Sequence, residues 1–108
     1  MATGRLSVPV QLGTGNTTIY TVPTGNYAVF NVSLTNTSAS AVTIKLGLSS
    51  STSPTTSEWI EQQTTIAGYG VFERTGLVAN AGMNVWVYTT GATNAVNVNV
   101  YGIETSTT

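Results

Sequence analysis

Regular alternation of apolar and polar residues along short segments is the feature that most constrains how this chain can fold. Between Tyr27 and Asn36 every second residue is apolar, and the intervening positions become increasingly polar. Side chains on a strand point alternately to its two faces, so this pattern predicts a strand with one buried face. The same period of two runs from Val42 to Leu48 and from Val96 to Tyr101. We therefore predict strands in all three segments.

Weaker strand patterns, rich in β-branched and aromatic residues, fill much of the remaining chain. They cover Arg5 to Leu12, Thr17 to Val22, Glu58 to Thr65, Asn84 to Thr90 and a short run from Val71 to Arg74. Gly, Pro, Asn and Ser separate them, and no segment of useful length has a helical stripe. About seven or eight short strands with such regular turns predict an all-β, antiparallel fold. A sandwich of two sheets, Ig-like or jelly-roll-like, is favoured, with a small barrel as the alternative.

The length of 108 residues predicts a single domain spanning 1–108. Residues 1–12 are expected to form either a strand or an N-terminal arm. The polar residues 105–108 are expected to form a flexible tail. Neither a membrane span nor a signal peptide is recognisable in the sequence.

Charged residues are scarce, at 6% of the chain against about 25% in an ordinary domain. The sequence contains no His, Cys or Asp, which removes the usual zinc ligands, thiol nucleophiles and imidazole bases. Its three cations, Arg5, Lys45 and Arg74, are too few to neutralise a run of phosphates. We expect no metal, no cofactor, no nucleic acid and no membrane partner.

The acidic residues are four glutamates, Glu58, Glu61, Glu73 and Glu104. Acid and base catalysis requires two carboxylates facing one substrate, and the spacing supports no such pair: positions 58 and 61 fall on opposite faces of a strand. All four are expected to be charges at the surface or in an interface. No catalytic residue is assigned, and the protein is not expected to be an enzyme.

The segment from Asn84 to Thr90 has apolar residues at odd and at even positions, with Val85 and Val87 on one face of the expected strand and Trp86 and Tyr88 on the other. A two-layer sandwich covers one face of each sheet, so the second face indicates a loop or, as we favour, a neighbouring subunit. The chain also has few Lys or Pro residues that would guard its strand edges, which are therefore expected to be occupied. The candidate assembly contacts are Arg5, Leu6, Val8, Val10, Trp86 and Tyr88.

Several segments resemble those of small virion proteins of tailed phages, in particular phages of cyanobacteria and marine bacteria. Tyr20 to Gly25 reads YTVPTG, Glu58 to Glu61 reads EWIE, Phe72 to Gly76 reads FERTG and Val100 to Glu104 reads VYGIE. They are similar to the YTVPxG, EYIE, LERTG and VYGIE segments of that group. The resemblance extends from Thr17 to Glu104 and implies a β-sandwich head or tail protein without catalytic residues.

The resemblance, together with the aromatic face, leads us to expect a non-enzymatic capsid decoration or cement protein. Its expected partners are copies of itself, with a trimer as the first candidate, and the major capsid protein or other virion proteins. It would be made in the host cytoplasm and reside on the virion, at the head surface rather than the tail. A tail, baseplate or fibre subunit is the alternative. A carbohydrate-binding module that stacks sugars on Trp59 and Tyr69 is the alternative of another class.

Overall fold

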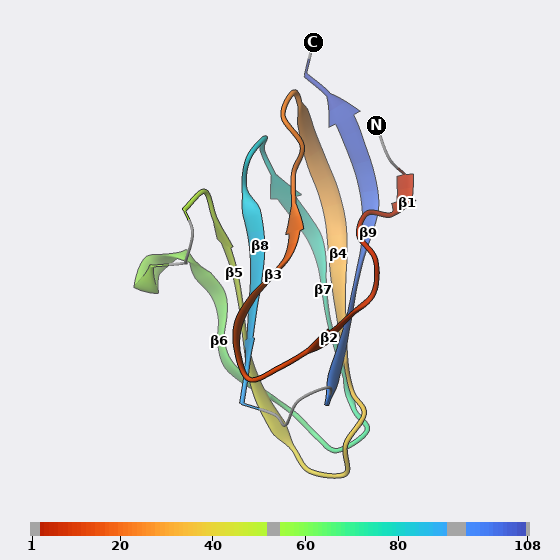
Figure 1. Cartoon of the computed structure of the whole chain (residues 1–108), viewed down its shortest axis with the longest axis vertical. Coiled ribbons are helices and arrows are strands. Elements are labelled where there is room, and N and C mark those ends of the chain that lie inside the picture. The colour runs from red at the N-terminus through yellow and green to blue at the C-terminus, as the bar shows by residue number, and fades with distance from the viewer. Residues whose placement is uncertain (1–2, 52–54, 91–94, 108) are drawn as a thin grey trace.

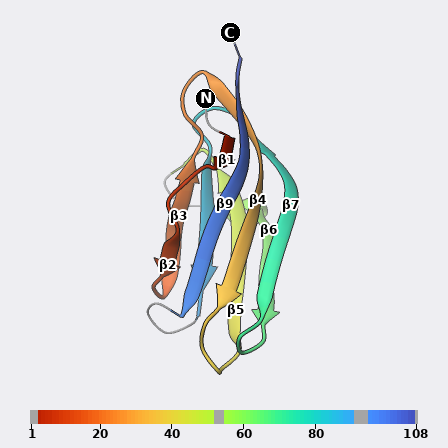
Figure 2. The same cartoon turned by 90° about the vertical axis from the view of Figure 1, so that its right-hand side faces the viewer.

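The computed structural model describes residues 3–51, 55–90 and 95–107, and it shows two antiparallel sheets packed face to face (Figures 1 and 2). Sheet A contains β1 (Thr3–Arg5), β2 (Val10–Leu12), β4 (Asn26–Asn36), β7 (Val71–Ala79) and β9 (Val96–Ser106). Sheet B contains β3 (Gly15–Thr21), β5 (Val42–Ser49), β6 (Trp59–Ile66) and β8 (Asn84–Thr89). The predicted all-β sandwich is therefore confirmed.

The strand order identifies the sandwich as a jelly roll. Sheet A runs β1-β9-β4-β7, with β2 also paired to β9, and sheet B runs β3-β8-β5-β6. The pairings are nested along the chain: β2 with β9, β3 with β8, β4 with β7, and β5 with β6. A long hairpin folded over on itself produces this nesting, which distinguishes a jelly roll from an Ig-like sandwich.

Three predicted boundaries are wrong. The N-terminal segment is not one strand, because β1 and β2 are separate short strands that pair with different parts of β9. β7 does not stop at Arg74 but continues to Ala79. The expected flexible tail is strand up to Ser106, because β9 pairs with β4 along its whole length, and the Thr107 amide donates to the Gly25 carbonyl. Residue 108, like residues 1 and 2, lies outside the described residues.

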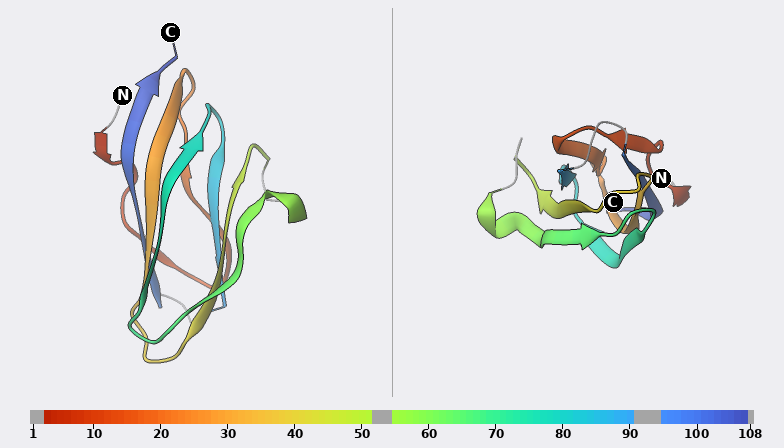
Figure 3. Two further views of the ribbon diagram at one scale, coloured as in Figure 1. Left: turned by 180° about the vertical axis from the view of Figure 1, so that it is seen from behind. Right: turned by 90° about the horizontal axis from the view of Figure 1, so that it is seen from below.

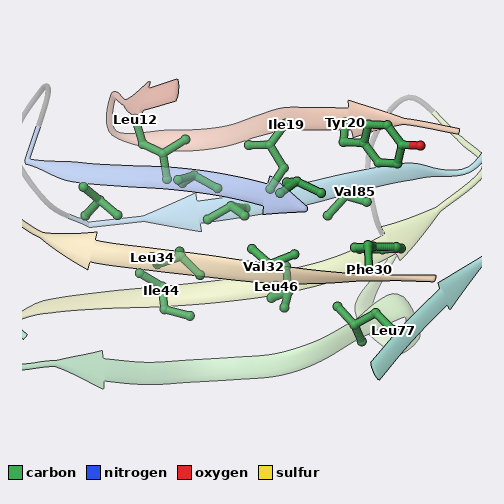
Figure 4. Packing of buried hydrophobic residues seen from close by; sticks show 14 of the residues in the cluster. Leu12, Ile19, Tyr20, Phe30, Val32, Leu34, Ile44, Leu46, Leu77 and Val85 are labelled. Atoms are coloured by element: carbon green, nitrogen blue, oxygen red, sulfur yellow. The ribbon is translucent and has the colours of Figure 1, made fainter. Parts of the chain in front are cut away.

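The core lies between the inner faces of the two sheets. Figure 4 shows side chains from both layers meeting there, such as Phe30 of β4 and Leu46 of β5. Phe30, Leu34, Ile44 and Leu46 are almost completely buried. Because these residues occupy alternate positions on their strands, the period of two in the sequence corresponds directly to the buried face.

Bulges interrupt three of the edge strands. In β3 the register shifts after Thr18, in β7 two residues including Gly76 lie opposite one residue of β4, and β6 has two shifts. A bulge bends an edge strand and interrupts its row of free hydrogen-bonding groups. The remaining edge, formed by β1 and β2, consists of strands of three residues each. Bulges and short strands, rather than Lys and Pro residues, therefore limit the pairing of these edges with another strand.

The single helical element among the described residues is a 3₁₀ turn, η1 (Thr56–Glu58), which projects from the side of the sandwich just before β6 (Figure 3). In the described part of the chain no helix is long and apolar enough to cross a membrane. The predicted strand from Glu58 to Thr65 corresponds to β6, which pairs with β5.

Candidate functional site

The outer face of sheet B carries a cluster of aromatic side chains around β8. Val85 and Val87 of this strand point into the core and are fully buried. Trp86 and Tyr88 point to the opposite face and are half-buried. The two-faced pattern in the sequence therefore corresponds to a strand that is covered on one side and partly open on the other.

Neighbouring strands complete this cluster with a lysine and a second tryptophan. β5 is paired with β8 so that Lys45 lies opposite Tyr88. The Lys45 Nζ atom lies 4.9 Å from the centre of the Tyr88 ring and 5.7 Å from the centre of the Trp59 ring. Both distances lie within the range of cation–π attraction. We call Lys45, Trp59, Trp86 and Tyr88 the aromatic cluster.

Gly47 allows Trp59 to lie against the sheet. It is the cross-strand neighbour of both Trp86 on β8 and Trp59 on β6. A Cβ atom at Gly47 would lie 2.9 Å from Cε3 of Trp59, closer than side-chain atoms normally approach. Local sequence patterns do not predict this arrangement, because Trp59 and Trp86 are far apart along the chain and are brought together by their common neighbour Gly47 on β5.

The surface around the aromatic cluster is amphipathic. Aromatic rings present flat amphipathic area, and the lysine adds one positive charge. The adjacent edge strand β3 contributes Asn16 and Thr18, which lie in register with Tyr88 and Trp86. An aromatic centre with a rim of hydroxyl and amide groups is typical of a protein contact surface.

The predicted contacts in the N-terminal segment fall into two groups. Arg5 and Val8 are exposed, Val8 to 75%. Leu6 and Val10 are half-buried and pack against the core, and the Leu6 amide donates to the Val100 carbonyl at 2.9 Å. Leu6 and Val10 are therefore held by the domain itself, and only Arg5 and Val8 of this group are free for a partner.

The structure does not bring Trp59 and Tyr69 together. Trp59 begins β6, whereas Tyr69 lies in the turn beyond its other end, where it is 71% exposed. The two ends of β6, Trp59 and Ile66, are seven positions apart along the strand, which corresponds to about 23 Å. A single sugar ring cannot bridge this distance, so the two do not form one stacking platform. The Trp59 ring lies instead beside Lys45.

Glu104 is not the surface charge that was expected. Its side chain is 6% exposed, and it accepts a hydrogen bond of 2.5 Å from the hydroxyl of Tyr20, which is equally buried. This bond joins β9 of sheet A to β3 of sheet B. Burial of the phenol, reinforced by the hydrogen bond to Glu104, raises the pKa of Tyr20. Sequence reasoning missed the pair because the two residues are 84 positions apart.

The other glutamates also have defined partners. Glu61 forms an ion pair with Arg74, which links the edge strands β6 and β7 of the two sheets. Glu73, the neighbour of Arg74, points to the opposite face and accepts a hydrogen bond from the Tyr101 hydroxyl. Glu58 accepts a hydrogen bond from the Thr55 amide at 2.8 Å, which lowers its pKa. Each of the four glutamates thus has a defined partner within the domain.

Buried Asn36 is a further residue that the sequence did not single out. It is fully buried at the end of β4, and its Nδ2 group donates to the carbonyl oxygens of Ser40, Ile66 and Ala67. Its Oδ1 atom accepts from the Ser38 amide at 3.0 Å. One amide side chain thus ties the β4–β5 turn to the β6–β7 turn at one end of the sandwich.

No group of three or more acidic side chains that could hold a metal occurs among the described residues. Searches of protein-family models, of curated proteins and of solved structures found nothing that matches this chain.

Proposed function

We propose that this protein is a non-enzymatic structural protein of a phage virion, of the capsid decoration or cement type. The observation that carries the proposal is a jelly roll whose edges are bulged or short while its faces bear exposed aromatic and aliphatic side chains. Such a module associates through its faces rather than by adding strands at its edges.

The fold supports this assignment. Jelly rolls are common among viral capsid and lectin domains, but one fold serves many functions. The resemblance of four segments to tailed-phage virion proteins favours the virion among these possibilities. The low charge points the same way, since weak mutual repulsion favours close association of many copies.

Adhesion is the proposed mechanism. The aromatic cluster on sheet B would press against the head shell, formed by the major capsid protein, and each copy would bridge neighbouring capsomers. Apolar burial contributes about 25 cal/mol per Å², from which the entropy cost of association is subtracted. Because many copies and neighbouring contacts act together, each contact needs only modest strength.

Copy number is the most direct test of this proposal. The chain is counted by quantitative mass spectrometry in purified virions of the phage that encodes it. A decoration protein is expected in hundreds of copies per particle, spread evenly over the head. A few tens of copies, or label confined to the tail, would identify a tail, baseplate or fibre subunit instead. Absence from the particle would overturn the proposal altogether.

A matched pair of variants tests the proposed shell-binding surface. Tyr88→Ala removes an aromatic ring from the aromatic cluster, whereas Tyr69→Ala removes a more exposed ring outside it. We expect Tyr88→Ala to lower head occupancy at least tenfold and Tyr69→Ala to leave it unchanged. Circular dichroism of both variants checks that the fold persists. Equal occupancy for the two variants would contradict the assignment of this surface.

Carbohydrate binding remains a second candidate because one observation favours it. The Trp59 ring lies on the outer face of sheet B beside Lys45, where a flat sugar could stack. In that case Trp59→Ala should abolish retention on a glycan array and leave assembly intact. An array on which the unchanged protein binds no glycan would remove this candidate.

A further inference from the structure

The outer face of sheet A carries a row of exposed aliphatic side chains. Ile103 of β9 lies opposite Val29 of β4, which in turn lies opposite Val78 of β7. These three side chains are 53%, 42% and 61% exposed. Tyr27, two residues before Val29 on the same face, is also exposed. We call Tyr27, Val29, Val78 and Ile103 the aliphatic row.

Beside the aliphatic row the same face is mostly polar, with Val71 as a further exposed aliphatic residue, and it carries one charge of each sign on strands at opposite margins. Arg5 lies on the β1 margin, in register with Tyr101 of β9. Glu73 lies on the β7 margin, in register with Ser33 of β4, and its carboxylate leans across β4 to accept the hydrogen bond from the Tyr101 hydroxyl. A shallow hollow of about 500 Å³ opens beside the β1 margin, and it is lined by Gly4, Arg5, Ser33, Asn99, Val100 and Tyr101.

We propose that this face packs against the same face of a second copy of the chain, around a two-fold axis. The axis runs parallel to the strands and passes between β9 and β4, the two central strands of sheet A. This rotation exchanges the margins, so β1 of one copy lies over β7 of the other. Ile103 then meets Val29 of the partner subunit, and Arg5 lies over the margin that carries Glu73 of the partner subunit.

Charge complementarity favours a second copy as the occupant. A two-fold interface must be complementary to itself, which requires opposite charges at positions that the axis exchanges. Arg5 and Glu73 meet this condition in the direction across the strands. Along the strands the two residues are offset by two positions, since Arg5 is level with Asn31 of β4 and Glu73 is level with Ser33 of β4. This offset of about 7 Å is within the reach of an arginine side chain.

The area of the face is large enough for a stable pair. The two central strands have 11 residues each, and four strands lie side by side in the order β1-β9-β4-β7. At about 3.3 Å per residue and 4.8 Å between strands, the face offers roughly 600 Å² per copy. Specific interfaces begin at about this size per partner. Pairing through the face also fits the bulged edges, which disfavour extension of the sheet by a second chain.

The inference deepens the proposed self-association and specifies a pair where the sequence led us to expect a trimer. The aromatic clusters on sheet B remain uncovered in such a pair and point in opposite directions. Pairing therefore leaves the proposed shell-binding surface of a copy accessible.

Light scattering coupled to size-exclusion chromatography of the full chain at about 100 µM tests the pairing. One chain has a mass of 11.2 kDa, so the proposal predicts about twice that mass. Val78→Asp places a charge in the aliphatic row and should raise the dimer Kd at least tenfold. Ile60→Asp, at an exposed aliphatic residue of β6 in sheet B, is the matched control and should leave the Kd unchanged.

Charge exchange provides a second test that does not depend on apolar contacts. Arg5→Glu and Glu73→Arg should each weaken the dimer, and the double variant should restore it. A monomeric mass, or a double variant as weak as the single ones, would overturn the two-fold pairing. A trimeric mass would overturn it as well, while leaving the decoration proposal intact. The particle copy number tests that proposal separately, so the two failures are distinguishable.

Discussion

Replacing Tyr20 by Phe removes one buried hydroxyl group and leaves the aromatic packing of the core in place. The Tyr20 ring meets the Phe30 ring edge-on, with centroids 6.0 Å apart, and a phenylalanine keeps this contact. The lost interaction is the buried hydrogen bond to Glu104. Buried hydrogen bonds to charged groups contribute about 1.5–3 kcal/mol. We therefore expect Tyr20→Phe to lower the free energy of unfolding by about 2 kcal/mol.

The same variant should change how stability depends on pH in alkaline solution. Tyrosine in the unfolded chain ionises near pH 10, whereas burial and Glu104 raise the pKa of Tyr20 in the folded protein. The folded state then binds more protons than the unfolded state above pH 10, so stability falls as the pH rises further. One such group gives a slope of up to about 1.4 kcal/mol per pH unit. Tyr20→Phe should remove this contribution.

Urea unfolding followed by the fluorescence of Trp59 and Trp86 provides the assay, at pH 7 and between pH 10 and 11. The matched control is Tyr101→Phe, because the Tyr101 hydroxyl also donates to a glutamate, Glu73, but does so at the surface. At pH 7 the Tyr20→Phe midpoint should fall by about 1 M and the control midpoint far less. Equal midpoints for Tyr20→Phe and the unchanged protein, with the same alkaline slope, would refute the reasoning.

Three further changes test the scaffold. Gly102→Ala would place a Cβ atom 2.1 Å from a backbone oxygen of β4, so it should lower the free energy of unfolding in urea by more than about 3 kcal/mol. Gly13→Ala is the control, because the space around Gly13 is open, and it should change this free energy by less than about 0.5 kcal/mol. Asn36→Ala removes the buried amide group that donates to three carbonyl oxygens and should lower the thermal midpoint by an amount equivalent to about 2–3 kcal/mol. A double-mutant cycle on Arg74→Ala and Glu61→Gln should give a coupling of about 0.5 kcal/mol that weakens in high salt, because the pair is partly exposed.

The sequence predicted the strands whose alternation is uninterrupted. In β4 and β8 the buried positions follow the period of two from end to end. A bulge changes which side chains face the core, and the local pattern does not show this. In β3 the register shift places Ile19 and Tyr20, which are consecutive, together in the core. In β7 the bulge at Gly76 interrupts the pattern, which is why the predicted strand ended at Arg74.

The aromatic surface was predictable only in part. Trp86 and Tyr88 belong to one strand, so their common face follows from local alternation. The positions of Lys45 and Trp59 depend on the order β8-β5-β6, which is a property of the whole jelly roll. Local pattern therefore identifies a face, and strand order determines which residues gather on it.

The end of β9 shows how one departure from the pattern affects both faces of a sheet. Ile103 and Glu104 occupy inverted positions, with the aliphatic side chain exposed and the acid buried. The buried acid is tolerated because a hydroxyl on the opposite sheet, that of Tyr20, donates to it. Once Glu104 faces inward, the period of two requires Ile103 to face outward, where it joins Val29 in the aliphatic row. Glu104 was expected at the surface, and its inward orientation instead determines that Ile103 points outward on the proposed pairing face.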